Sequence, residues 1–222
     1  MEWEHNFPKG FGHTSIAFLK RCIGFEDAKN GDMDAALFVV SRCVKRDRIC
    51  DLRRKYPDAI LIPVLGINKL PLALAMAIGL PIWTKVYMIH SIPRKLLCSI
   101  QRLLHKPMFA GQILENTEYI LVDDVITTGG TISALRRFVM FHGGIVVAVV
   151  ALAYAIGSHA VAPLRRHIVR LMIKFGLGLL SLLRRLGIAV SAQGLTNSQV
   201  KYLLRFSSLG NIRKRAEQFI LT

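Results

Sequence analysis

Two adjacent carboxylates and the hydroxyl- and glycine-rich turn behind them are the residues of this sequence best suited to chemistry. Asp123 and Asp124 follow the apolar run Tyr119–Val122, and the turn follows two residues later as Thr-Thr-Gly-Gly-Thr at 127–131. Carboxylates at such a point can hold sugar hydroxyls or a divalent metal. Glycines let the backbone approach a ligand closely, and successive backbone N–H groups form an anion site. The combination favours a site for a phosphorylated sugar.

The segments around these residues predict the order strand, turn, helix. The apolar run before the acids is typical of a buried strand, and residues 132–139 have helical spacing. In a parallel α/β sheet, ligands bind at the carboxyl ends of the strands, which is where this turn would lie. Strand and helix patterns alternate through the middle of the chain, with further strands predicted at 59–64, 82–89 and 145–152. The predicted fold class is α/β, a Rossmann-like parallel sheet flanked by helices.

The run Val122–Thr131 resembles the phosphoribosyl pyrophosphate (PRPP) signature of the type I phosphoribosyltransferases, whose fold the resemblance therefore implies. It also implies Mg²⁺-PRPP as the ligand and transfer of its phosphoribosyl group with release of pyrophosphate. In the resembled family the two acids bind the ribose hydroxyls, so Asp123 and Asp124 take that role, with proton relay or metal contact in addition. The turn cradles the 5′-phosphate. Its residues here are Thr127, Thr128, Gly129, Gly130 and Thr131.

The competing nucleotide-binding motifs are absent. The sequence has no Gly-x-x-x-x-Gly-Lys-Ser/Thr loop, and no Gly-x-Gly-x-x-Gly follows a predicted strand. The remaining alternative for the motif is an ordinary joint of strand, turn and helix with solvated acids.

The loop after the first predicted strand has a role by the same resemblance. In the family it binds pyrophosphate with backbone amides and often a basic residue, which implies Gly66, Asn68 and Lys69 here. The alternative for Lys69 is an exposed lysine at a helix start. The string Asn-Lys-Leu-Pro at 68–71 departs from the Arg-Gly or Lys-Gly of well-known members. It resembles a bacterial phosphoribosyltransferase-like set that includes effectors linked to retrons and other mobile elements in antiviral defence.

Residues 90–112 stand where the resembled family carries a mobile flap over its active site. Here Leu96, Leu97, Ile100, Leu103 and Leu104 predict a packed amphipathic helix instead. The same stretch has enough positive charge to cover a pyrophosphate, from Arg94, Lys95, Arg102 and Lys106. Without a flap, an enzyme that transfers or hydrolyses the phosphoribosyl group competes with a PRPP- or nucleotide-binding effector that docks nucleic acid or a nucleoprotein.

The charge distribution supports an anionic partner. The 222 residues carry a net charge of +16, yet residues 59–114 contain no acid, and none follows Asp124 until Glu217. Thirteen Lys and Arg residues fall in that last interval. A field of one sign concentrates anions, and this spread favours a polyanion such as nucleic acid. A solvated basic face is the alternative.

The chain divides into three predicted parts: a helical N-terminal extension at 1–58, a phosphoribosyltransferase core at 59–155, and a basic helical region at 156–222. The first part contains helix 33–44 with Asp32 as N-cap. The last part contains an apolar stripe at helical spacing, expected to pack on or extend the core, and Thr196 as another N-cap. The stripe consists of Ile168, Leu171, Phe175, Leu179, Leu182 and Leu186.

The remaining composition favours a soluble cytoplasmic protein. The four cysteines form no Cys-x-x-Cys pair and the seven histidines are scattered, so neither a zinc site nor a disulfide framework is expected. The N-terminus lacks the apolar region of a secretory signal. Arginines and lysines interrupt residues 168–190, so no stretch reaches the roughly twenty apolar residues that span a membrane. Dimers are common in the resembled family, so a homodimer is a further expectation.

Overall fold

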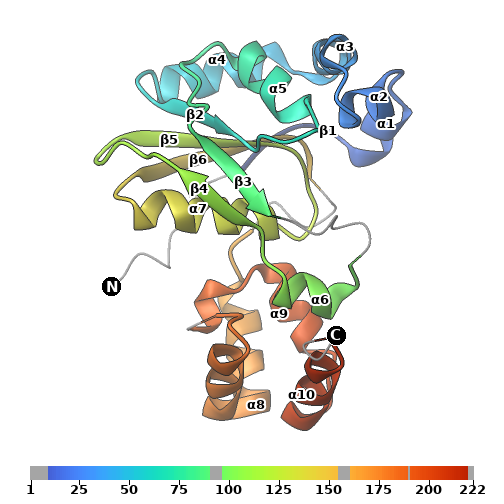
Figure 1. The fold of residues 1–222 in the computed structure, drawn as a ribbon, viewed down its shortest axis with the longest axis vertical. Helices are drawn as coiled ribbons and strands as arrows, with labels where there is room; N and C mark the ends of the chain where they lie inside the picture. The colour runs from blue at the N-terminus through green and yellow to red at the C-terminus, as the bar shows by residue number, and fades with distance from the viewer. Residues whose placement is uncertain (1–9, 91–96, 155–160, 190, 220–222) are drawn as a thin grey trace.

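The computed structural model describes residues 10–90, 97–154, 161–189 and 191–219. Its main sheet has four strands in the order β1-β6-β5-β2, and every neighbouring pair is parallel (Figure 1). The prediction of an α/β fold with a parallel sheet flanked by helices is confirmed. The strands are β1 (Gly10–Thr14), β2 (Ile60–Pro63), β5 (Glu118–Ile126) and β6 (Ile145–Tyr154).

The two central strands, β5 and β6, are buried along most of their length because helices cover both faces of the sheet. Alternate side chains of a strand point to opposite faces. Ile120 and Val122 accordingly join the core beneath α3 (Met33–Cys43) and α5 (Leu70–Ile78). Tyr119 and Leu121 face the other way, in the core that includes the buried side of α7 (Gly130–Phe141).

The N-terminal segment contributes to this sheet, so the prediction that residues 1–58 are wholly helical is wrong at β1. The strand has two glycines and no apolar alternation that would mark it locally. The neighbouring strand β6 explains the glycines of β1, because a Cβ added at Gly12 would lie 2.7 Å from Cδ2 of Tyr154 on β6. The other elements of the segment are helical as predicted. They are α1 (Ile16–Arg21), α2 (Phe25–Lys29), α3 and α4 (Arg46–Lys55).

Among the described residues of the stretch 90–112, for which an amphipathic helix is predicted, only α6 (Ser99–Leu104) is helical. The end of the stretch is strand β4 (Met108–Gly111), which pairs antiparallel with β3 (Val86–His90). The prediction is wrong there because the hydrogen-bond partner of β4 lies about twenty residues away in sequence, beyond the reach of local periodicity. Leu96 lies outside the described residues.

The C-terminal helices α8 (Arg165–Arg185), α9 (Asn197–Leu203) and α10 (Leu209–Glu217) form a second core. Ile100 and Leu103 of α6 are part of that core, and no residue of the main sheet is. We call α6 with α8–α10 the helical subdomain, which lies to one side of the sheet in Figure 1.

The predicted apolar stripe of α8 is buried at Leu171, Phe175, Leu179 and Leu182, but it packs within the helical subdomain and does not cover the sheet. Thr196 caps α9 as predicted, in a capping box with Gln199. The predicted C-terminal boundary falls at residues 155–160, outside the described part. No helix within the described ranges has the length and apolar character needed to cross a membrane.

Candidate functional site

A cleft of about 1020 Å³ opens at the carboxyl end of the central strands. Asp123, Asp124 and all five residues of the 127–131 turn line it, and so do Gly66 and Asn68 of the loop after β2. The structure therefore brings together two motifs that are more than fifty residues apart in sequence. This is the position at which parallel α/β sheets bind ligands.

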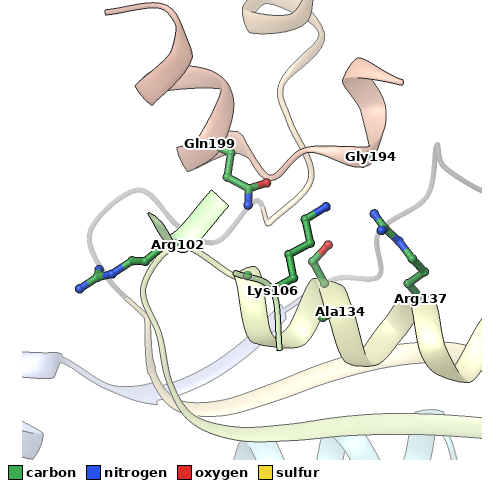
Figure 2. Close-up of a pocket in the computed structure, with 8 residues that line it drawn as sticks. Arg102, Lys106, Ala134, Arg137, Gly194 and Gln199 are labelled. Atoms are coloured by element: carbon green, nitrogen blue, oxygen red, sulfur yellow. The ribbon is translucent and has the colours of Figure 1, made fainter. Parts of the chain in front are cut away.

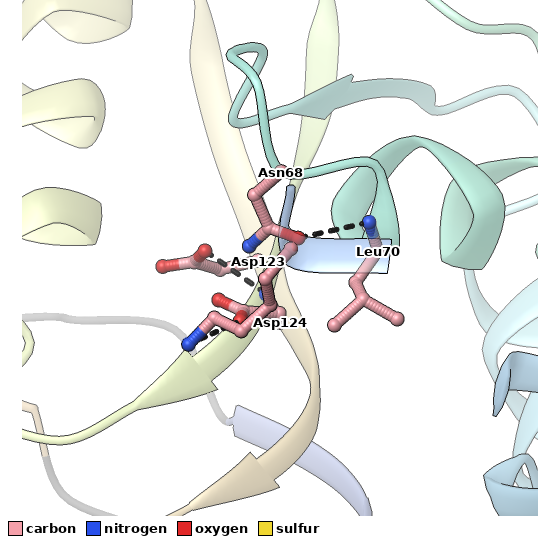
Figure 3. A network of polar contacts seen from close by, with 5 residues as sticks. Asn68, Leu70, Asp123 and Asp124 are labelled. Atoms are coloured by element: carbon pink, nitrogen blue, oxygen red, sulfur yellow. Dashed lines mark hydrogen bonds and ion pairs between the residues drawn. The ribbon is translucent and has the colours of Figure 1, made fainter. Parts of the chain in front are cut away.

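The two acids lie within the end of β5, not in the loop beyond it, and only 8% of each residue is exposed. Because they are neighbours in a strand, their side chains leave opposite faces. The Asp124 carboxylate lies 3.8 Å from Nζ of Lys29 on α2. Oδ1 of Asp123 accepts a hydrogen bond of 2.9 Å from the backbone N–H of Asp124 (Figure 3).

Burial, and then the negative charge of Asp124, raise the pKa of the Asp123 carboxyl well above its usual value. The Lys29 ammonium acts in the opposite direction, more weakly. Burial and the nearby Asp123 also raise the pKa of Tyr154. Asp123 therefore keeps its proton to a higher pH than a solvated aspartate.

The turn at the start of α7 is fixed by one glycine. Gly129 has φ = 72° and is the N-cap residue of α7. A Cβ at Gly129 would lie 2.5 Å from Cγ1 of Val161, so both the backbone conformation and the space require glycine. The N–H groups of the first turn of α7 have no partner inside the helix, and Gly130, Thr131 and Ile132 line the cleft. The turn can hold a phosphate.

The loop after β2 places two of its three predicted residues at the cleft. Oδ1 of Asn68 accepts a 3.1 Å hydrogen bond from the N–H of Leu70, which leaves the side-chain amide nitrogen as a donor (Figure 3). Gly66 lines the cleft and has nothing within 4 Å of an added Cβ. Lys69 does not line it, and the Lys69 backbone N–H donates to the carbonyl of Ala28 at 3.0 Å.

Positive charge reaches the cleft from elements outside both motifs. Lys20 of α1, Lys29 of α2 and Arg102 of α6 line it. The sequence draws attention to Arg102 through the basic stretch around it. It has no feature that marks Lys20 or Lys29, because both belong to a segment predicted only to pack. Of the other cations in the stretch, Arg94 and Lys95 lie outside the described residues.

The carboxylates that could bind a metal ion in the cleft are those of Asp123 and Asp124. Among the residues that the structure describes, no three His, Cys, Asp or Glu side chains come together as metal ligands. A divalent cation at Asp123 and Asp124 would therefore take its remaining ligands from a bound phosphate and from water, as Mg²⁺ commonly does.

No protein-family model matches the chain. It is 32% identical to protein TraN of Escherichia coli over 154 residues, which is 64% of the chain and 34% of TraN. It is 25% identical to an uncharacterized protein of Haemophilus influenzae over 150 residues, 63% of the chain and 34% of that protein. The chain thus spans about a third of the length of these two relatives.

Several solved structures resemble parts of the fold. A purine phosphoribosyltransferase from Pyrococcus horikoshii is 20% identical, with a TM-score of 0.35 over 55% of this chain and 72% of that one. An adenine phosphoribosyltransferase is 17% identical, with a TM-score of 0.36 over 53% of this chain and 74% of that one. UMP synthase of Leishmania donovani is 15% identical, with a TM-score of 0.37 over 77% of this chain and 33% of that one. Each similarity covers only part of the chains. The strand order and the parallel register of this chain define its α/β fold.

Proposed function

We propose that this protein is a phosphoribosyltransferase-like protein that binds Mg²⁺-PRPP in the cleft and transfers or hydrolyses its phosphoribosyl group, releasing pyrophosphate. One observation carries the proposal. Two buried acids at the end of β5 share a cleft with the Gly129 turn on one side and the Asn68 loop on the other. A sugar phosphate with a second anionic group at C1 has hydroxyls and phosphates that match these three features.

Each motif has a distinct role in the proposal. Asp123 and Asp124 bind the ribose hydroxyls, and the turn at 127–131 binds the 5′-phosphate. Gly66 and Asn68 bind the pyrophosphate, Asn68 through its amide nitrogen, and Lys69, which does not line the cleft, takes no part. Lys29, beside Asp124, adds positive charge to the cleft. Mg²⁺, when bound, supplies charge neutralisation on the phosphate oxygens.

The protein would accelerate loss of pyrophosphate by position and charge. As the bond at C1 lengthens, positive charge develops on the ribose and negative charge on the leaving pyrophosphate. The aspartates lie on the ribose side, and the donors of the Asn68 loop lie on the pyrophosphate side. Groups fixed in advance need no reorganisation when the charge develops.

Calorimetry with Mg²⁺-PRPP tests the proposal directly. We expect wild type to bind and Asp124→Asn to bind at least about tenfold more weakly, a loss of about 1.4 kcal/mol. Asp51→Asn is the matched control, because Asp51 is an exposed acid on α4, paired with Arg54, and its removal should leave the affinity unchanged. Equal affinity in Asp124→Asn, or no binding by wild type, would contradict the assignment.

The alternative function is a PRPP- or nucleotide-binding effector that docks nucleic acid. The observation that favours it is the surface of α8–α10, where exposed cations are opposed only by Glu217 among the described residues. Release of pyrophosphate from PRPP with a panel of bases, or with water, separates the two functions. An effector would bind PRPP without turnover and would carry nucleic acid through purification until salt releases it.

A further inference from the structure

A second cavity adjoins the phosphate-binding turn at Thr128. It measures about 210 Å³ and lies between α6 and α9. Thr128 of the turn and Arg102 of α6 line both this cavity and the cleft, so the two spaces meet at these residues. The other lining residues are Ser99, Leu103, Ser198, Gln199, Lys201, Tyr202 and Arg205. We call it the side cavity.

The walls of the side cavity suit an anion that carries an aromatic group. Arg102, Lys201 and Arg205 are positive, and none of its lining residues is an acid. The hydroxyls of Ser99, Thr128 and Ser198 add hydrogen-bond donors. The ring of Tyr202 offers a surface on which a base could stack, and Phe206 holds it edge to face at a centroid distance of 5.3 Å.

A recess of about 10 Å³ continues the positive surface behind the side cavity and shares Arg102 and Gln199 with it. Lys106 and Arg137 point into this recess from the sheet side, and Gln199 points into it from α9 (Figure 2). The Gln199 carbonyl oxygen accepts from the N–H of Thr196 at 2.7 Å, so its amide nitrogen remains as a donor.

Lys106 adds buried positive charge beside the side cavity. Its Nζ is buried and has no hydrogen-bond partner among the described residues. Burial, and then the charge of Arg137, lower the pKa of Lys106 to about 8. None of the residues that line the recess is an acid, and a recess of this size is too small for a phosphate. The charges of Lys106 and Arg137 therefore favour an anion in the adjoining side cavity.

We propose that the side cavity binds a second phosphate group on the 5′ side of the ribose in the cleft, so that the complete site accepts the 3′ end of an RNA strand. This inference rests on the proposed function, because it takes the roles of the acids and the turn from it. Two aspartates that bind both ribose hydroxyls need a free 2′,3′-diol, which an RNA strand has only at its 3′-terminal nucleotide. The preceding nucleotide then places its phosphate among Arg102, Lys201 and Arg205 and its base against Tyr202.

Comparison of one nucleotide with two tests the inference on the full-length protein. The probes are AMP and the 5′-phosphorylated ribodinucleotide pApA, measured by calorimetry. We expect pApA to bind at least about tenfold more tightly than AMP, from the added charge-assisted hydrogen bonds. A dinucleotide whose terminal nucleotide carries a 3′-phosphate should lose this affinity, because the diol is blocked.

Two variants locate the gain. Lys201→Gln and Arg205→Gln should each bring the affinity for pApA close to that for AMP and leave the affinity for AMP unchanged. Both residues line the side cavity and are exposed, so their substitution should not disturb folding. The matched control is Lys214→Gln, an exposed lysine on α10 outside the side cavity, which should change nothing.

The outcomes separate this inference from the function it rests on. If PRPP binds but pApA binds no more tightly than AMP, the inference is wrong and the proposed function stands. If neither PRPP nor AMP binds, the proposed function is wrong as well. If inorganic phosphate raises the affinity for AMP in a Lys201-dependent manner and pApA gains nothing over that, the cavity is a site for a free phosphate and not for an RNA strand.

Discussion

Asp123, an acid that lines the cleft, lowers the stability of the fold that holds it. Its carboxyl is buried beside a second carboxyl, and its pKa is raised for both reasons. In the unfolded chain the same group ionises near pH 4. Between that pH and the raised folded value, the folded protein holds a proton that the unfolded chain has lost. The free energy of unfolding therefore falls as the pH rises through this window.

We expect Asp123→Asn to remove this penalty. The amide keeps an oxygen that can accept from the Asp124 N–H, as Asp123 Oδ1 does now. Urea unfolding at pH 5 and pH 8 should show the variant gaining stability over wild type as the pH rises, while PRPP binding is lost. A wild-type stability curve parallel to that of Asp123→Asn over this range would disprove the raised pKa.

Asn68 allows its two side-chain roles to be separated. Its oxygen caps the start of α5 and its amide nitrogen remains as a donor. Asn68→Asp keeps the cap but replaces the donor with a negative charge, so we expect PRPP affinity to fall at least about tenfold. The melting temperature should stay within a few degrees of wild type. A large loss of stability with unchanged affinity would mean that Asn68 serves the helix alone.

At the scale of elements, the joint between β5 and α7 depends on Gly129. We expect Gly129→Ala to cost about 1–2 kcal/mol for the positive φ, and more for the overlap with Val161, with loss of PRPP binding. Gly187→Ala is the control, because Gly187 also has a positive φ, 65°, but nothing within 4 Å of an added Cβ. Thermal unfolding and calorimetry measure both effects.

The same joint offers a rescue experiment. Val161→Ala removes the methyl group closest to the added Cβ. In the Gly129→Ala background it should recover the part of the lost stability that comes from overlap, and leave the part that comes from the backbone. Equal stability of the single and double variants would show that the backbone strain alone accounts for the loss.

Across the whole molecule, the two layers around the sheet and the core of the helical subdomain share no buried residue. Leu179→Ala should therefore destabilise the helical subdomain by about 2–5 kcal/mol. Hydrogen exchange should show α8–α10 losing protection while β5 and β6 keep theirs. Loss of protection in all of these elements together would mean that the two parts unfold as one unit.

The local parts of the site can be predicted from the sequence alone. The order of β5, turn and α7 follows from an apolar run, two glycines and a helical repeat, all within about twenty residues. The Asp32 and Thr196 caps are equally local, because a capping side chain reaches a backbone N–H two or three residues ahead. Interactions of such short range can be predicted from residue types and spacing.

The other residues that line the cleft come together only when distant parts of the chain pack. β1 is a strand because β6 offers it an edge and Tyr154 packs against its glycines. Lys29 reaches Asp124 because α2 lies over the end of β5, and Arg102 joins the cleft to the side cavity because α6 packs with α9 and α10. These contacts depend on chain crossings over dozens of residues, and no local pattern encodes them. The sequence thus specified the acids and the turn, and the packing of distant helices specified the charge around them.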